Sequence, residues 1–520
     1  MMDRLDLAAL DAALDALPKR YPGPGGVAGV VKDGEIVAAR AWGHANLETA
    51  QPMTATTRLP ICSISKQFTC QVLLATVGDP AQLDDRVGAF LPAYTGTMPT
   101  TRQLCDNQSG LRDYWALTVL QGGLAEQTFA RADALPLIAR MKTGHFLPGS
   151  SYSYCNCNFR ILSEMIEAET GEGLEALYRR HIWGPAGMAG AVLAADTRQP
   201  VDGVAGYEGS DATGFTPADN GIFWIGDAGI AASLEDMLAY ECWIDATRED
   251  AGSLYRRISE PPHFADGTPA RYGYGLAHDE VAGLAFTGHG GALRGFRCHR
   301  MNARAARLSV VVMFNHEASA ATAAQDLVRA ALGEAPATPA RVADDWEGQW
   351  LAENGLVARI TPARHGAMLH YATGAEAVAP GADGTLTAPG MTLSRDGDDL
   401  LIRRSRDNAA LRCTPLPVVD AADAGEIAGR WISDELGAVM EVEVWGGGAS
   451  VRFAGMLGQG RPERVAPVGR DVWQVATRRS MDAPAPGDWT LVLQRDDAGK
   501  VAGLVLGCWL ARGIAYRREA

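Results

Sequence analysis

The chain of 520 residues changes character at residues 333–340, and this change most constrains its fold. Gly333-Glu334-Ala335-Pro336-Ala337-Thr338-Pro339-Ala340 suits neither a strand nor a heptad, so we predict a linker. Before it, helical and strand patterns are mixed; after it, only short runs of alternating apolar and polar residues occur. Because the length exceeds what one domain normally holds, we expect an α/β domain over residues 1–332 and an all-β region beyond it.

The all-β region contains a repeat. Gly348-Gln349-Trp350 is echoed by Gly429-Arg430-Trp431, and a proline-rich segment, Thr414-Pro415-Leu416-Pro417, lies between the two copies. Aspartate-glycine pairs separate the short alternating runs, as in a meander of hairpins. Two small antiparallel β-barrel domains are therefore predicted, at residues 341–413 and 418–520.

The first 332 residues are predicted to combine an antiparallel sheet with a helical lobe. Asp33-Gly34 lies between two apolar runs, which is a strong signal for a hairpin over Val27–Ala41. Helical patterns dominate from Lys66 to about Asp250, strand patterns return over Tyr272–Phe314, and Ala320–Leu332 suits a final helix. We expect the polar motifs described next to lie between the sheet and the helices.

Ser63-Ile64-Ser65-Lys66, near the start of a predicted buried helix, suits acyl transfer. Residues three apart share a helix face, so the Lys66 ammonium would reach the Ser63 hydroxyl. A serine becomes a strong nucleophile when an adjacent base, such as a lysine with a lowered pKa, takes its proton. The alternative is a capping serine with a solvated lysine. However, the chain strongly prefers arginine and has only five lysines, so Lys66 is a notable choice.

Together with Tyr154-Cys155-Asn156 and His289-Gly290-Gly291, this motif resembles those of the penicillin-recognising serine enzymes. Class C β-lactamases, DD-carboxypeptidases, related esterases and D-stereospecific aminopeptidases belong to that family. The resemblance covers roughly the first two-thirds of the chain. It extends to the segments Thr101–Leu104, Gln108–Leu111, Pro148-Gly149, Pro185–Met188 and Ala228–Ser233.

The resemblance implies a role for each motif residue. Ser63 would attack the substrate, Lys66 and Tyr154 would share the proton transfers, and Asn156 and His289 would orient the site. Whether Lys66 or Tyr154 is the general base is left open by the sequence. Cys62, beside Ser63, is an alternative nucleophile, but no histidine lies at a spacing known for cysteine enzymes.

We place the third motif at His289-Gly290-Gly291 and not at Lys142-Thr143-Gly144. The latter matches the K-T-G of many family members but precedes Tyr154, so we interpret it as a helix end with a glycine cap. Glycines 290 and 291 would let substrate approach the backbone closely, although a glycine-rich turn between strands is the alternative. By resemblance, the backbone N–H groups of Ser63 and Ala292 form the oxyanion hole.

His289 stands where many family members carry a lysine. A lysine is a permanent charge suited to a carboxylate, whereas a histidine is mostly neutral at pH 7. The substitution favours a substrate without a carboxylate there, and it makes D-aminopeptidases, which also have a long C-terminal extension, the nearest resemblance. We expect an aminopeptidase that releases N-terminal D-residues (of the D-alanine type) or glycine from peptides, amides and esters through an acyl-enzyme. Alternatives are an esterase, a β-lactam-binding hydrolase, or a catalytically dead binding protein.

The two barrels have two possible roles. They can cover the α/β domain or build a homodimer, as appended β-domains often do. Alternatively, the proline-rich segment Arg478–Gly487 can project from the last barrel as a loop. By resemblance to D-aminopeptidases, this loop would reach the active site and present Asp482 to a substrate ammonium group, a charge-assisted contact.

Composition excludes several function classes. The net charge of -15 argues against nucleic-acid or anionic-membrane partners. The N-terminal leucines suit an amphipathic helix instead of a secretory signal, and no run is long enough to span a bilayer, so we expect a cytoplasmic protein. The nine cysteines include no C-x-x-C pair, and Cys155 and Cys157 are interpreted as buried residues. No nucleotide-binding or metal motif occurs, so we expect neither cofactor nor metal.

Overall fold

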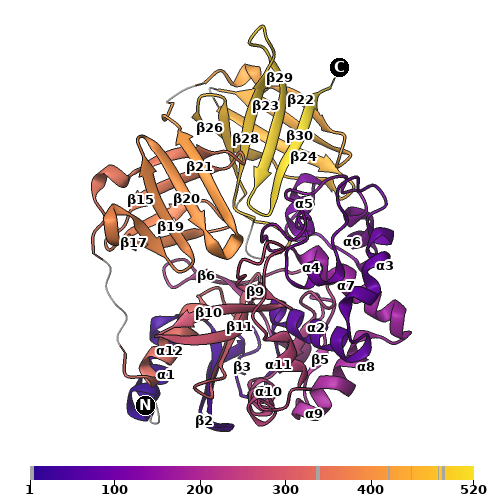
Figure 1. The fold of residues 1–520 in the computed structure, drawn as a ribbon, viewed down its shortest axis with the longest axis vertical. Coiled ribbons are helices and arrows are strands. Elements are labelled where there is room, and N and C mark those ends of the chain that lie inside the picture. Colours follow the sequence, from indigo (N-terminus) through magenta and orange to yellow (C-terminus); the bar gives the residue numbers. More distant parts are fainter. Residues whose placement is uncertain are drawn as a thin grey trace.

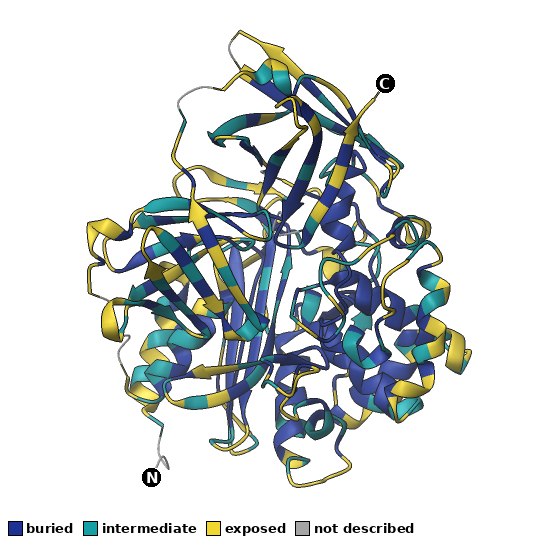
Figure 2. Cartoon of the chain, turned by 45° about the horizontal axis from the view of Figure 1, so that its top comes forward, coloured by how far each residue is buried: buried dark blue, intermediate teal, exposed yellow. Residues whose placement is uncertain are grey.

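The computed structural model describes residues 5–334, 340–419, 422–446, 448–477, 479–482 and 486–519. Most of the predicted linker, residues 335–339, therefore lies outside the described residues. Figure 1 shows an α/β part (residues 5–334) in the lower half, with two β-barrels above it. Buried positions follow the central sheet and the helices beside it, whereas exposed positions gather on the outer turns and helices (Figure 2).

An antiparallel sheet forms the centre of the α/β part. Among the described residues it has eight strands in the order β3-β2-β1-β13-β12-β11-β10-β9. Asp33 and Gly34 join β1 to β2 with φ values of 56° and 84°, the left-handed conformation that an aspartate-glycine turn favours, so the predicted hairpin is confirmed. The strands are β1 (Gly25–Lys32), β2 (Glu35–Asn46), β3 (Gln51–Pro52), β9 (Tyr272–Gly273), β10 (Leu276–Val281), β11 (Leu284–Leu293), β12 (Phe296–Ala303) and β13 (Leu308–Phe314).

Two terminal helices cover one face of this sheet. α1 (Leu7–Arg20) and α12 (Ala320–Ala331) bury their apolar sides against β1 and β13, in one cluster with Leu14 and Leu327. Both helices were predicted from the spacing of their apolar residues, which recur on one side of a 3.6-residue turn. Their packing closes the sheet face that lies away from the helical lobe.

The helical lobe covers the other face, and α2 lies at its centre. α2 is buried along nearly its whole length, and its buried residues include the polar side chains of Ser65, Lys66 and Gln67. The helices of the lobe are α2 (Ser65–Thr76), α3 (Asp84–Val87), α4 (Thr101–Cys105), α5 (Tyr114–Leu120), α6 (Arg131–Ile138), α7 (Asn156–Thr170), α8 (Leu174–Tyr178), α9 (Gly184–Ala186), α10 (Leu234–Ala246) and α11 (Leu254–Ile258). Its short strands are β4 (Leu59–Pro60), β5 (Val192–Leu193), β6 (Tyr207–Ser210), β7 (Gly214–Pro217) and β8 (Ile230–Ala232).

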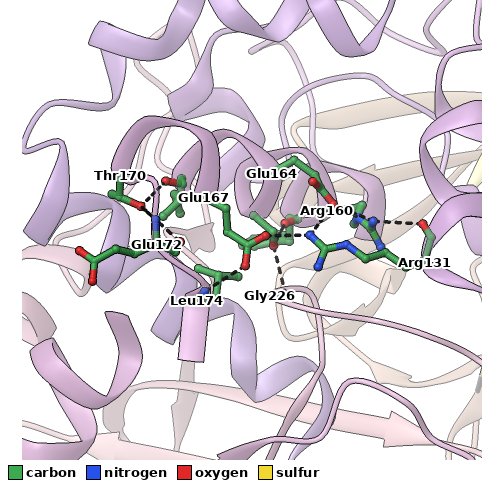
Figure 3. A network of polar contacts seen from close by, with 11 residues as sticks. Arg131, Arg160, Glu164, Glu167, Thr170, Glu172, Leu174 and Gly226 are labelled. Carbon is green, nitrogen blue, oxygen red and sulfur yellow. Dashed lines mark hydrogen bonds and ion pairs between the residues drawn. The ribbon is translucent and has the colours of Figure 1, made fainter. Parts of the chain in front are cut away.

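A polar network holds α7 against its neighbours (Figure 3). Arg160, which is 1% exposed, donates to Glu164 Oε1 at 2.7 Å and to the carbonyl of Arg131 at 3.2 Å. Glu167 accepts from the backbone N–H of Leu174 at 3.0 Å. One turn before Glu167, Ser163 Oγ accepts from the N–H of Gly226 at 3.1 Å. The network therefore fixes α7 relative to the segment that carries Asp227.

The helix expected to begin near Ser63 is confirmed: a single 3₁₀ turn, Cys62–Ile64, leads directly into α2 at Ser65. Another sequence interpretation in this region is wrong. Lys142-Thr143-Gly144 is not a helix end, because α6 stops at Ile138. Instead, Lys142 Nζ donates to the carbonyl of Asp434 at 2.8 Å and the Thr143 N–H donates to Glu435 at 3.0 Å, so this segment docks on the all-β region.

The all-β region forms two closed antiparallel barrels, as the sequence repeat predicted. In the first barrel, β14 pairs with both β15 and β21, which closes the ring; in the second, β23 pairs with both β22 and β24. The first barrel comprises β14 (Gly348–Ala352), β15 (Val357–Pro362), β16 (Ala367–His370), β17 (Ala375–Pro380), β18 (Leu386–Ala388), β19 (Met391–Asp396), β20 (Asp399–Arg404) and β21 (Ala409–Pro415). The second comprises β22 (Gly429–Ser433), β23 (Ala438–Trp445), β24 (Gly448–Gly455), β25 (Gly458–Gln459), β26 (Glu463–Gly469), β27 (Val472–Ala476), β28 (Asp488–Arg495), β29 (Val501–Cys508) and β30 (Ala511–Arg518).

A helix that crosses a bilayer must be both long and apolar. Across the described ranges, no helix combines the length and the apolar character that crossing a bilayer needs.

Candidate active site

Ser63 lies in a sharp turn at the start of α2. The preceding residue, Cys62, has a φ of 50°, which is the left-handed conformation that costs energy for a residue with a side chain. This turn leaves the Ser63 side chain partly exposed at a cavity, while its neighbours Cys62 and Ile64 are buried. The local backbone thus presents one hydroxyl group from an otherwise buried segment.

Lys66 lies beneath Ser63 and is completely buried. Its Nζ donates to Ser63 Oγ at 3.0 Å, to Asn156 Oδ1 at 2.8 Å and to the backbone carbonyl of Asp227 at 2.7 Å. Burial lowers the pKa of Lys66 to about 8, against the opposing effect of nearby carboxylates that include Asp227. A neutral lysine amine, able to accept a proton, is therefore accessible near physiological pH.

Tyr154 contacts the same hydroxyl group and also lines the cavity. Its ring centroid is 4.9 Å from Lys66 Nζ. Burial raises the pKa of Tyr154 well above its ordinary value, although a hydrogen bond with Ser63 opposes the shift. Tyr154 thus retains its proton under conditions in which Lys66 begins to lose one.

Asn156 is oriented by a buried aspartate that the sequence reasoning missed. Asp113 Oδ1 accepts from the backbone N–H of Asn156 at 2.6 Å and from its Nδ2 at 3.0 Å. The amide oxygen of Asn156 is thereby directed at Lys66. Burial raises the pKa of Asp113 to about 6. In the sequence, the signal that could have found Asp113 is its position just after the segment Gln108–Leu111.

Asp227 is a second missed residue. Its carbonyl binds Lys66, while its carboxylate accepts from the Tyr114 hydroxyl at 2.9 Å and the Ile225 N–H at 2.8 Å. The side chain therefore fixes the turn whose carbonyl holds the lysine. It directly precedes the segment Ala228–Ser233, and that adjacency is the signal that could have found it.

His289, on β11, is held as a neutral ring. Its Nδ1 contacts the carbonyl oxygen of Gly290, and its Nε2 lies 2.9 Å from the Tyr272 hydroxyl. A carbonyl only accepts, so Nδ1 carries the proton and Nε2 accepts from the tyrosine. Burial, together with the charge of Lys66, lowers the pKa of His289 to about 3. The position that is a lysine in many family members is therefore uncharged here.

The glycines after His289 keep β11 close to the Ser63 turn. A Cβ atom on Gly291 would lie 2.3 Å from both the Ile61 carbonyl oxygen and Cys298 Sγ, so a larger residue does not fit. β10 pairs with β11 only as far as Gly288, which leaves the following residues of that edge facing the cavity. Gly290, Gly291 and Ala292 all line it.

These residues surround one cavity of about 450 Å³. Its walls include Ser63, Tyr154, Asn156 and His289, while Lys66 lies behind Ser63. Asp482 also lines this cavity, so the structure brings it to the other predicted site residues. Residues 478 and 483–485 of the predicted loop lie outside the described residues. Ser480 and Pro486, from the loop that the sequence predicted to reach the active site, line it as well. Sequence reasoning did not anticipate the further lining residues Trp115, Thr373, Trp509 and Leu510, most of which come from the barrels.

The cysteines near the site are buried thiols. Burial raises the pKa of Cys62 well above its ordinary value, so this thiol stays protonated and the alternative of a cysteine nucleophile is not supported. Cys155 and Cys157 are also buried, with their sulfur atoms 3.0 Å apart. Within the described ranges, no group of three histidine, cysteine or carboxylate side chains could hold a metal ion.

Comparison with known families assigns the two regions separately. The model described as Beta-lactamase matches residues 10–335, and the model described as D-aminopeptidase, domain B, matches residues 339–517. The octameric penicillin-binding protein homologue from Pyrococcus abyssi shares the fold with a TM-score of 0.53 and 16% identity, over 98% of this chain and all of that one. The fold and the site therefore define a β-lactamase-like serine hydrolase.

Relatives that match over the whole length show which family within this class of hydrolases the chain belongs to. A D-aminopeptidase from Cereibacter sphaeroides (strain ATCC 17029 / ATH 2.4.9) is 64% identical over 99% of each chain. A D-aminopeptidase from Brucella anthropi is 48% identical, again over 99% of each chain. The chain belongs to the D-aminopeptidase family.

Proposed function

We propose that this protein is a serine aminopeptidase that releases an N-terminal D-residue of the D-alanine type, or glycine, from small peptides, amides and esters. One observation carries the proposal: the Ser63–Lys66–Tyr154 cluster and the carboxylate of Asp482 face the same cavity. The cluster suits acyl transfer, and the carboxylate suits a substrate with a free ammonium group. Membership of the D-aminopeptidase family supports the same assignment.

In the first half of the proposed reaction, Ser63 Oγ attacks the scissile carbonyl and its proton passes to Lys66. The lowered pKa of Lys66 and the raised pKa of Tyr154 favour the lysine as the acceptor. The backbone N–H groups of Ser63 and Ala292 stabilise the oxyanion. Tyr154 then protonates the leaving amine and regains a proton from Lys66, which leaves the acyl-enzyme and neutral Lys66.

In the second half, water attacks the ester of the acyl-enzyme. Lys66 accepts the proton of this water, and the Ser63 oxygen leaves with a proton returned through the Lys66–Tyr154 pair. Asn156 keeps Lys66 in place, because its amide oxygen accepts from Nζ at 2.8 Å. The products are the free D-amino acid and the restored serine.

Substrate choice follows from two groups at the cavity. Asp482 attracts the ammonium group of the residue to be released. Neutral His289 provides no cation for a carboxylate, which disfavours the carboxypeptidase and β-lactamase activities of the wider class. The proposed preference for D-residues rests on membership of the D-aminopeptidase family.

The first test compares the p-nitroanilides of D-alanine, L-alanine and N-acetyl-D-alanine, with Ser63→Ala as the control. We expect cleavage of the D-alanine compound alone, and at least a 1,000-fold loss in the variant, on the order of the effect of removing a catalytic nucleophile. Cleavage of simple esters without any anilide would contradict the aminopeptidase and support the esterase. Full activity of Ser63→Ala would contradict acyl transfer through this serine.

Three further predictions accompany the proposal. We propose domains at residues 1–332, 341–413 and 418–520, a homodimer, and a cytoplasmic location. Light scattering after size-exclusion chromatography tests the dimer, limited proteolysis tests the boundaries, and cell fractionation tests the location.

A further inference from the structure

The described segment Arg479–Asp482 contacts the α/β part through Asp482, Met481 and Arg479. Asp482 lines the catalytic cavity, and Met481 is 1% exposed. A Cβ atom on Gly123 would lie 2.8 Å from the terminal methyl group of Met481, so the two residues are closely packed. Ser480 Oγ donates to the carbonyl of Asp482 at 2.7 Å. These contacts leave Arg479 directed outward, to a different set of partners.

Arg479 bridges two carboxylates of the α/β part. Its Nη1 lies 2.5 Å from Glu126 Oε1, and its Nη2 lies 2.7 Å from Glu208 Oε2. Glu126 follows α5, and Glu208 lies on β6, so one guanidinium joins two elements far apart in sequence. The fixed fork of an arginine suits such a bridge better than the single ammonium of a lysine.

The Glu126 carboxylate also contacts the end of β11, the strand that carries Ala292. Glu126 Oε1 lies 3.5 Å from Arg294 Nη1, and Arg294 directly follows the last residue of β11. Arg294 is 3% exposed and donates to the carbonyl of Asp219. Glu126 therefore links the segment that carries Asp482 to the strand that carries Ala292.

Global stability does not explain this arrangement well. The Arg479 side chain is 44% exposed, and exposed ion pairs typically contribute about 0–1 kcal/mol to folding. Meanwhile, the buried side chain of Met481 already ties the segment to the core. The bridge instead restrains the direction in which the backbone runs from Arg479 to Asp482, three residues later.

We propose that Arg479, held by Glu126 and Glu208, is a positioning residue that sets the place of Asp482 and thereby the selectivity for substrates with a free amine. This inference rests on the proposed aminopeptidase function. Arg479 does not line the cavity that contains Ser63. Its loss lets the Asp482 carboxylate move relative to the cavity, which weakens binding of the ammonium group and leaves the acyl-transfer chemistry intact.

The test measures Arg479→Gln on two substrates: D-alanine p-nitroanilide, which has an amine, and p-nitrophenyl acetate, which has none. We expect KM for the anilide to rise about tenfold, the size of one weakened charge-assisted contact, with kcat changed less than twofold. Turnover of the ester should stay within twofold of the unaltered protein. Arg479→Lys should recover part of the anilide KM, since it keeps the charge but loses the fork.

Two further variants separate the bridge from a general loss of charge. Arg461→Gln is the matched control, because Arg461 also faces Glu126, at 3.6 Å, but is 70% exposed and lies outside the Asp482 segment. It should leave both substrates unchanged. Glu208→Gln should raise the anilide KM, and combining it with Arg479→Gln should add little, as expected for two residues of one interaction.

The outcomes are distinct. An unchanged anilide KM in Arg479→Gln overturns the inference, as does an equal loss on anilide and ester, which indicates a merely structural role. An effect of Arg461→Gln as large as that of Arg479→Gln also overturns it. If the unaltered protein turns over the ester but not the anilide, the aminopeptidase function itself fails and the inference falls with it.

Discussion

The two barrels have the same architecture but join the rest of the molecule differently. The second barrel shares one continuous apolar core with the α/β part: Trp431 and Met481 belong to the same cluster as Leu120. The first barrel has a distinct core around Trp350 and Leu369, which includes Trp509 of the second barrel and packs against Tyr152 and Tyr154 at its edge. Figure 1 shows the second barrel directly beside α5. The second barrel is therefore joined to the α/β part through a shared apolar core, whereas the first barrel keeps its own core and meets the α/β part only at the edge of that core.

Polar contacts attach the first barrel to the segment before Tyr154. The carbonyl of Asp407 accepts from the backbone N–H of Tyr152 at 3.1 Å and from the Ser151 hydroxyl. Asn408 donates to the carbonyl of Ser150 at 3.0 Å. Within the barrel, the Asp407 carboxylate pairs with buried Arg404. The comparison teaches that the second barrel completes the core and presents Asp482, whereas the first barrel supports Tyr154 from outside.

The sharpest way to break this comparison is to remove a core tryptophan from each barrel. Trp431→Ala should lower the free energy of unfolding by about 3–5 kcal/mol, because the missing side chain leaves a cavity in the shared core. On heating, this variant should lose its activity in the same transition in which the α/β part unfolds. Trp350→Ala should cause a similar loss confined to the first barrel. Calorimetry of both variants, together with the activity that remains after heating to each temperature, checks this. A single transition common to both variants would contradict the separation of the cores.

Replacing the carboxylate that the second barrel presents should have the next largest effect. Asp482→Asn is expected to reduce kcat/KM for D-alanine p-nitroanilide by about 100-fold, or about 2.7 kcal/mol, because the substrate ammonium loses its charged partner. Turnover of p-nitrophenyl acetate, which has no amine, should change little. Steady-state kinetics on both substrates decides the matter, and equal losses on the two would rule out a role in amine recognition.

Loosening the support from the first barrel should have a smaller effect with a different signature. Asp407→Ala leaves Arg404 with Glu376 but releases the turn that holds Tyr152. We expect kcat to fall about tenfold on both anilide and ester, since a small displacement of Tyr154 impairs proton transfer, while KM stays constant. Asp396→Ala, on the exposed side of the same barrel, is the control. A KM effect limited to amine substrates would argue against this role.

The smallest expected effect concerns pH. The negative charge of Asp482 raises the pKa of Lys66, and burial lowers that pKa to about 8. Because the neutral lysine is the proposed base, kcat/KM for p-nitrophenyl acetate should rise with pH through about 8. Asp482→Asn removes the charge that favours protonated Lys66, so this rise should move to lower pH. A shift to higher pH, or none, would contradict coupling between the two groups.

Local patterns predicted much of this protein. The Asp33-Gly34 hairpin, the terminal helices and the repeat of two barrels depend on turn chemistry and on periodicity within short windows, so the sequence contains their signals. The motif residues Ser63 and Lys66 are only three apart, and one helical turn brings them to 3.0 Å. The spacing of these two residues was therefore enough to predict a serine acyl-transfer site.

Other features depend on the packing of distant segments, and only the tertiary structure decided them. Asp113 and Asp227 support Asn156 and Lys66 across separations of 43 and 161 residues. A buried carboxylate has the same sequence appearance as an exposed one, so only the nearness of these residues to the segments Gln108–Leu111 and Ala228–Ser233 marks them in the sequence. The misinterpreted Lys142 segment likewise finds its partners 292 residues away, on the second barrel.

The sequence by itself determined which residues can carry the chemistry: the serine, the lysine, the tyrosine and their spacing are covalent facts. The tertiary structure decided the state of those residues. Lys66 has a pKa near 8, and His289 is neutral, because burial removes the water that would stabilise their charged forms. Burial is a property of the whole packed molecule, so no window of the chain contains it.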